Sequence, residues 1–187
     1  MRRALPVLAL VLWPATVLGA ALTLTEAQQQ EAIRAGERST AVEAFDAEWT
    51  VTGADGEPVV VLTPFHRLLL AARNAAFSGK SLGRGEPEKI LRETRDRLVF
   101  WVSLRGRSED FARRYVPRLK VGEREIKPTF VQNEHTAARQ DDGRYLARCV
   151  YGFPTRDVTG RERVTLVVLD AGGRDVTRFT IDLAEMR

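Results

Sequence analysis

The sequence predicts an α+β fold, with N-terminal helices packed on an antiparallel, Ig-like β-sandwich. In the first half of the chain, apolar residues recur with the spacing that places them on one face of a helix. From residue 97 onward, short apolar runs alternate with turn residues about every 8–12 positions, which is typical of a sandwich. We therefore expect a helical part to about residue 96 and a mainly β part over residues 97–187.

The first 20 residues have the pattern of a secretory signal peptide. Arg2 and Arg3 precede a long uncharged, apolar stretch, and small residues follow it. Cleavage is expected after Ala20 or Ala21, which leaves residues 21–187 as a single exported domain, either periplasmic in a bacterium or secreted. The alternative is an uncleaved leader that anchors the chain in the inner membrane. The apolar stretch is barely as long as the roughly 20 residues that a spanning helix needs.

A helix and a hairpin are predicted next. Thr25 and Gln28 have the spacing of a capping box, in which each side chain bonds a free backbone amide at the start of a helix. This helix is predicted to run to about Ala35, with Gly36 as its stop. Residues 48–62 contain two short strand-like runs around a Gly-Ala-Asp-Gly turn. We expect them to form a hairpin that adds strands to the sandwich.

A second helix is predicted to begin after Thr63, a threonine cap that precedes Pro64 at the first helical position. Its apolar residues have the spacing of an amphipathic helix. They are Phe65, Leu68, Leu69, Ala72, Ala75 and Ala76. The helix is expected to end by Gly79, and a further helix is predicted from Pro87 to about Thr94.

The second half of the chain is predicted to consist mainly of strands. They cover residues 98–104, 115–121, 125–131, 144–153, 163–169 and 176–183. The first of them is apolar on both faces, which predicts a central strand buried on both sides. Cys149, the only cysteine, lies on the apolar face of its strand and is expected to be a core residue.

Composition favours a globular protein and disfavours nucleic acid as a partner. The chain has 187 residues, of which 44% are hydrophobic and 29% are charged. The formal charge of +4 falls by two, to +2, when Arg2 and Arg3 leave with the leader. The exported part is therefore only weakly basic, and we expect neither a nucleic-acid partner nor stable membrane insertion after cleavage.

The sequence shows no recognisable catalytic group, and we predict no cofactor and no metal. His66 is interpreted as a structural residue, whereas His135 follows Glu134 in a loop. One histidine and one carboxylate are too few for zinc, which takes about three or four protein ligands. Asp141 and Asp142 precede a glycine and are interpreted as a hairpin turn. The enzymatic alternative is a metal-dependent or carboxylate-based hydrolase that uses His135 with these acidic residues.

The stretch 105–120 concentrates positive charge and aromatic rings. The candidate partner-binding residues are Arg105, Arg107, Phe111, Arg113, Arg114, Tyr115 and Arg118. Arginine and aromatic side chains are typical of the residues that dominate the binding energy of protein interfaces. The alternative is a solvated connection whose aromatics face the core. Within this stretch, Ser108 is predicted to cap a short helix that begins at Glu109.

Together these features favour a non-enzymatic binding or interaction module of the cell envelope. The leader predicts export, and sandwiches commonly bind through loops and edge strands. An envelope protein or an anionic surface is the expected partner, since either suits the cluster of arginines.

Overall fold

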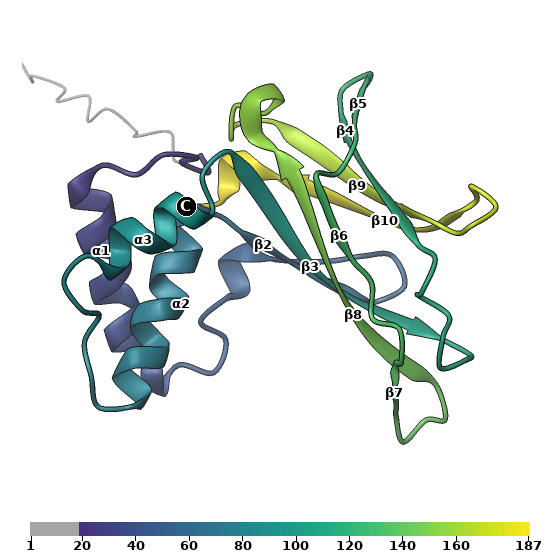
Figure 1. Ribbon diagram of the computed structural model, residues 1–187, viewed down its shortest axis with the longest axis horizontal. Helices are drawn as coiled ribbons and strands as arrows, with labels where there is room; N and C mark the ends of the chain where they lie inside the picture. The colour runs from purple at the N-terminus through teal and green to yellow at the C-terminus, as the bar shows by residue number, and fades with distance from the viewer. Residues whose placement is uncertain (1–18) are drawn as a thin grey trace, which may run out of the picture.

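The computed structural model describes residues 19–187, which form three α-helices and two antiparallel β-sheets (Figure 1). The α+β class predicted from the sequence is therefore confirmed. The predicted signal peptide lies almost wholly outside the described residues. Within residues 19–187, no helix combines the length and the apolar composition that crossing a membrane requires.

The larger sheet has six strands and includes the predicted hairpin. Its spatial order is β1 (Thr50–Thr52), β2 (Pro58–Leu62), β3 (Arg97–Gly106), β8 (Tyr145–Pro154) and β6 (Phe130–Gln132), and β7 (Ala138–Arg139) also pairs with β8. The hairpin β1–β2 extends this sheet because β2 pairs with β3. The smaller sheet has the order β10 (Asp175–Asp182), β9 (Arg163–Leu169), β4 (Val116–Val121) and β5 (Arg124–Ile126).

The two sheets share one apolar core. Successive side chains of a strand point to opposite faces, so alternate residues of the central strands enter this core. The largest side chains buried there include Phe100, Leu104, Leu119, Tyr151, Phe153, Leu166, Phe179 and Ile181. Cys149 lies on the same face and is 1% exposed, which confirms the prediction of a core cysteine.

The helices lie at one end of the larger sheet (Figure 1). They are α1 (Glu26–Arg38), α2 (Pro64–Phe77) and α3 (Glu86–Glu93), and single 3₁₀ turns cover Ser39–Ala41, Ala47–Trp49, Thr155–Asp157 and Leu183–Glu185. The predicted capping box between Thr25 and Gln28 is present at the start of α1. Thr63 caps α2, since its hydroxyl accepts a hydrogen bond from the His66 amide at 3.1 Å. Both predicted helix starts are thus confirmed.

Gly36 does not end α1, contrary to the prediction. The helix continues to Arg38, and Gly36 is buried where α1 packs along α2. A Cβ atom at this position would collide with the Leu69 carbonyl oxygen and would lie 2.8 Å from the Ala72 Cβ. The glycine therefore serves the close approach of two helices, and not a helix stop.

Two strand predictions were also wrong in part. The predicted strand 125–131 is divided into β5 and β6, which belong to different sheets. Pro128 lies between them, and a proline cannot donate a hydrogen bond to a sheet ladder. The strand β3 is central in its sheet, as predicted, but it is not buried on both faces, because Trp101 is 47% exposed.

Arg187 joins the helices to the sheets. Its carbonyl oxygen accepts hydrogen bonds from Trp49 Nε1 at 2.9 Å and from Thr63 Oγ1 at 2.6 Å. Its guanidinium pairs with Glu48 at 2.7 Å and with Glu31 of α1 at 3.3 Å. A single residue that follows the last strand therefore contacts a helix, a helix cap and the turn before β1.

Candidate partner-binding surfaces

The loop between β3 and β4 carries most of the predicted partner-binding residues. It forms successive turns and not the short helix predicted from Glu109. The Ser108 hydroxyl bonds the Asp110 carboxylate at 3.0 Å and so does not cap a helix. Phe111 packs over Gly106, where an added Cβ would collide with its ring, and this contact holds the loop against the end of β3.

The structure divides the predicted residues into two groups. Arg105 pairs with Asp142 at 3.1 Å, and Arg118 on β4 pairs with Glu125 at 3.0 Å. Arg107 is exposed in the loop. The first group therefore consists of Arg105 and Arg118, which are paired within the chain, and Arg107, which is exposed.

The second group forms what we call the arginine-loop surface. Its residues are Phe111, Arg113, Arg114 and Tyr115, with Asp170 and Arg174 from the turn between β9 and β10. They line an open depression of about 450 Å³. Arg174 pairs with Asp170 at 2.8 Å. The Phe111 and Tyr115 rings meet edge to face with centroids 5.8 Å apart, and both are half-buried, so most of their apolar area is turned inward.

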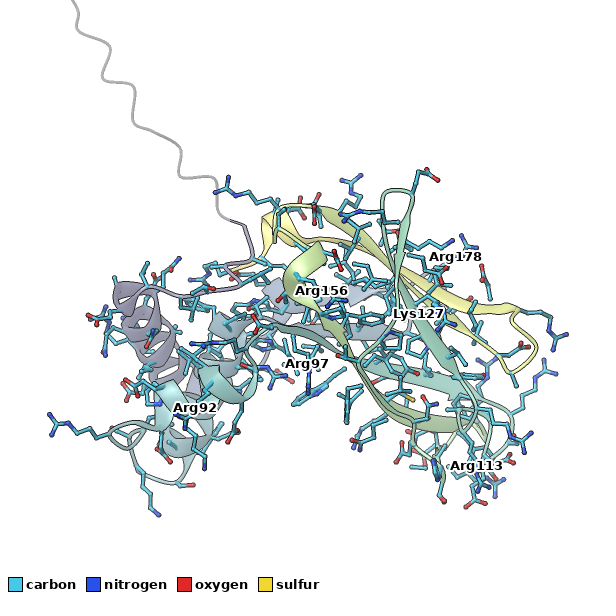
Figure 2. The ribbon with its side chains drawn as sticks, turned by 45° about the horizontal axis from the view of Figure 1, so that its top comes forward. Arg92, Arg97, Arg113, Lys127, Arg156 and Arg178 are labelled. Carbon is cyan, nitrogen blue, oxygen red and sulfur yellow. The ribbon has the colours of Figure 1, made fainter. Side chains whose placement is uncertain are left out.

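A second concave surface lies on the outer face of the larger sheet, beside the helices. We call it the Trp101 groove. Its lining residues are Arg67, Glu93, Thr94, Arg97, Val99, Trp101, Phe130, Gln132 and Val150, and its volume is about 390 Å³. Figure 2 shows Arg97 between the helices and the sheets, whereas Arg113 of the arginine-loop surface lies at the far end of the sheets. The two surfaces are therefore separate.

Strand register brings the apolar part of the Trp101 groove together. Trp101 on β3 faces Val150 on β8, which in turn faces Gln132 on β6. Phe130 lies on the same face, two residues from Gln132 along β6, and faces Gly152. Trp101 is 47% exposed and Phe130 is 40% exposed, so both rings present apolar area to solvent.

Gly152 leaves room for the arginine that closes one end of the groove. A Cβ atom on Gly152 would lie 2.9 Å from Arg97 Cδ and 3.2 Å from Phe130 Cβ. The aliphatic stem of Arg97 therefore lies over Gly152, beside the Phe130 side chain. The sheet face forms this close contact only because glycine has no side chain.

Two arginines meet at this end of the groove. Arg67 comes from α2 and Arg97 from the start of β3, and among the described residues Glu93 supplies the only carboxylate in the lining. None of the ion pairs within residues 19–187 includes Arg67 or Arg97. The Nε atom of Arg67 is buried and has no hydrogen-bond partner in the described part of the chain. Burial and the nearby positive charge of Arg97 lower the pKa of Arg67 from its usual value.

The residues considered for hydrolysis lie in loops and turns of the larger sheet. His135 is exposed, and the Glu134 carboxylate accepts a hydrogen bond from the Arg148 amide at 2.5 Å. Asp141 and Asp142 lie in the turn between β7 and β8, as predicted. Within residues 19–187, no group of three or more His, Cys, Asp or Glu side chains is arranged to hold a metal ion.

His66 belongs to the core and not to a surface site. It is 1% exposed, and its ring stacks on Trp49 with centroids 4.4 Å apart. Its Nδ1 lies 3.1 Å from the Val61 carbonyl oxygen, which requires the proton on Nδ1 in the neutral ring, whereas Nε2 has no partner among the described residues. Burial lowers the pKa of His66 from 6.5 to about 4.

Sequence reasoning missed the Trp101 groove because its parts are far apart in the chain. The local signal was present in β3, where exposed Arg97, Trp101 and Arg105 share one face. A strand buried on both sides does not carry two arginines on one face. The contribution of α2, β6 and β8 follows only from the sheet order.

No protein-family model matches the chain, and none of the curated proteins matches it. A crystal structure of a protein of unknown function from Burkholderia pseudomallei is similar at 9% sequence identity and a TM-score of 0.42. The alignment covers 88% of this chain and 96% of that one.

Proposed function

We propose that this chain is an exported, non-enzymatic binding module of the bacterial cell envelope, and that the Trp101 groove is its partner-binding surface. The observation that supports this surface is its composition: one concave site is lined by two exposed aromatic rings and by two arginines that form no ion pair with any residue in the described part of the chain. Aromatic and arginine side chains contribute most of the binding energy in many interfaces. Exposure of the apolar Trp101 and Phe130 rings to water is unfavourable, and a bound partner that covers them recovers this free energy.

Three expectations from the sequence are part of the proposal. The leader of the first 20 residues motivates export, residues 21–187 are taken as one exported domain, and the two sheets are taken to form an Ig-like sandwich. The arginine-loop surface is the alternative contact surface. Its exposed Arg113 and Arg114 suit an acidic partner, but its half-buried rings offer less apolar area than Trp101 and Phe130 do.

A crosslinked pull-down from the native envelope tests the proposal. The bait carries its tag at the N-terminus, because Arg187 is bonded within the fold. The groove variant is Trp101→Ala with Phe130→Ala. Its matched control is Phe77→Ala, which removes an aromatic ring that is 61% exposed on α2, outside the groove. A further variant, Arg113→Glu with Arg114→Glu, tests the arginine-loop surface.

We expect at least one partner that wild type and the Phe77→Ala control capture equally and that the groove variant loses. Reconstitution with the purified partner then shows whether the contact is direct. Loss of capture only in the Arg113→Glu, Arg114→Glu variant would transfer the function to the arginine-loop surface. Equal capture by all variants would remove both surfaces from the proposal.

A further inference from the structure

The Trp101 groove is polarised along its length. At the end near α2 and α3, Arg67 and Arg97 place two positive charges in the lining, whereas among the described residues only Glu93 adds a carboxylate to it. At the other end, Trp101 and Phe130 present apolar rings. A ligand that matches both ends therefore needs an anionic group close to a large apolar group.

We propose that the groove recognises a polypeptide segment in which an acidic residue lies next to an aromatic or large aliphatic residue. This inference rests on the proposed function. The acidic side chain pairs with the guanidinium groups of Arg67 and Arg97. The apolar side chain packs between Trp101 and Phe130, over Val150. Arginine suits this role because its planar group binds a carboxylate through two parallel hydrogen bonds.

The position of β6 favours a polypeptide over a lipid. β6 is the edge strand of the larger sheet, and its three residues are all exposed. An extended segment that adds to this edge would present every second side chain to the face that carries Phe130 and Gln132. A lipid chain instead needs a longer apolar enclosure, and this groove has charged residues at one end and Gln132 at its rim.

Selection from a phage-displayed library of random peptides about 12 residues long tests this inference directly. The bait is the mature wild-type protein, and peptides that also bind Trp101→Ala are removed. We expect the selected peptides to place Asp or Glu within one or two positions of Phe, Trp, Tyr or Leu. An empty selection, or peptides without enriched acidic residues, would overturn the inference.

A double-mutant cycle with synthetic peptides tests the arginine contact itself. Each selected peptide is compared with its Glu→Gln or Asp→Asn form, on wild type and on Arg97→Gln. Because charge-assisted pairs are stronger than neutral hydrogen bonds, we expect neutralising the peptide to weaken binding to wild type about tenfold or more. The same change should weaken binding to Arg97→Gln much less. Equal losses on both proteins would contradict the contact.

The outcomes separate this inference from the proposed function. Groove-dependent capture of an envelope protein, with no acidic preference in the peptides, would leave the binding module and refute the acidic ligand. Groove-dependent binding to vesicles of phosphatidylethanolamine and phosphatidylglycerol, with an empty peptide selection, would refute the polypeptide and indicate an anionic lipid. Absence of any groove-dependent capture, together with an empty peptide selection and no groove-dependent vesicle binding, would refute both proposals.

Discussion

Acidification should destabilise this protein through His66. The imidazole is buried against Trp49, and in its neutral form it donates from Nδ1 to the Val61 carbonyl oxygen. A second proton would have to sit on Nε2, which has no partner among residues 19–187. Charging the ring in the folded state therefore buries an unpaired N–H group together with a positive charge.

The size of the effect follows from the pKa of His66, which burial lowers from 6.5 to about 4. Between these values the unfolded chain binds a proton that the folded chain does not, so the free energy of unfolding falls as the pH falls. The expected slope is about 1.4 kcal/mol per pH unit, and the full loss is at most about 3.4 kcal/mol. Above pH 6.5 this contribution is fully present.

Urea unfolding of the mature protein between pH 4 and pH 7.5, followed by far-ultraviolet circular dichroism, measures this loss. The comparison is with His66→Asn, whose amide keeps a donor near the Val61 carbonyl but does not titrate. Glu57 acts in the opposite direction, because burial raises its pKa and its contribution to stability is lost as the pH rises. That term is common to both proteins and cancels in the difference. Parallel stability curves for wild type and His66→Asn over this range would refute the reasoning.

Other substitutions test the packing. Gly36→Ala should lower the free energy of unfolding by about 1–3 kcal/mol, because the added methyl group meets the α2 backbone and this outweighs the higher helix propensity of alanine. Urea unfolding measures this loss, and unchanged stability would contradict the close packing. Arg187→Ala should cost about 1–2 kcal/mol, with part of the loss disappearing in high salt, as thermal unfolding at two ionic strengths would show. Cys149 should not react with a disulfide reagent at pH 8 until the chain unfolds, because burial removes access and raises the pKa of the thiol; rapid labelling of the native protein would disprove its burial. A chain that begins at Ala20 should be more stable than one that begins at Leu22 by about 1–2 kcal/mol. The reason is that Ala20 is buried and its backbone nitrogen donates a hydrogen bond to the Leu183 carbonyl oxygen at 2.8 Å. Equal melting temperatures would argue against that contact.

Local sequence signals predicted the elements whose cause is local. The caps at Thr25 and Thr63 act within three residues of themselves, so the pattern and the structure agree. The apolar residues that alternate around Cys149 likewise indicated a strand with one buried face, and they lie on β8. In each case the relevant physics involves only neighbouring residues in the chain.

Predictions failed where a distant segment decides the outcome. Gly36 has the local appearance of a helix stop, but its role comes from the backbone of α2. The run 105–118 appears as one basic surface, yet Arg105 is paired with a residue 37 positions away and Arg118 with Glu125 in the neighbouring strand. The Trp101 groove needs residues from two helices or their ends and three strands, and no local pattern contains that arrangement.

The contacts of Arg187 have a consequence for how the chain reaches its final form. They join residues that are 139 and 156 positions apart, and they attach α1 and the cap of α2 to the end of the smaller sheet. Closing loops of that length is entropically costly and slow. During synthesis, a ribosome adds this residue after every strand. The helices and sheets can therefore begin to form early, but their junction can close only when Arg187 has emerged, and a nascent chain remains accessible to chaperones and proteases until then.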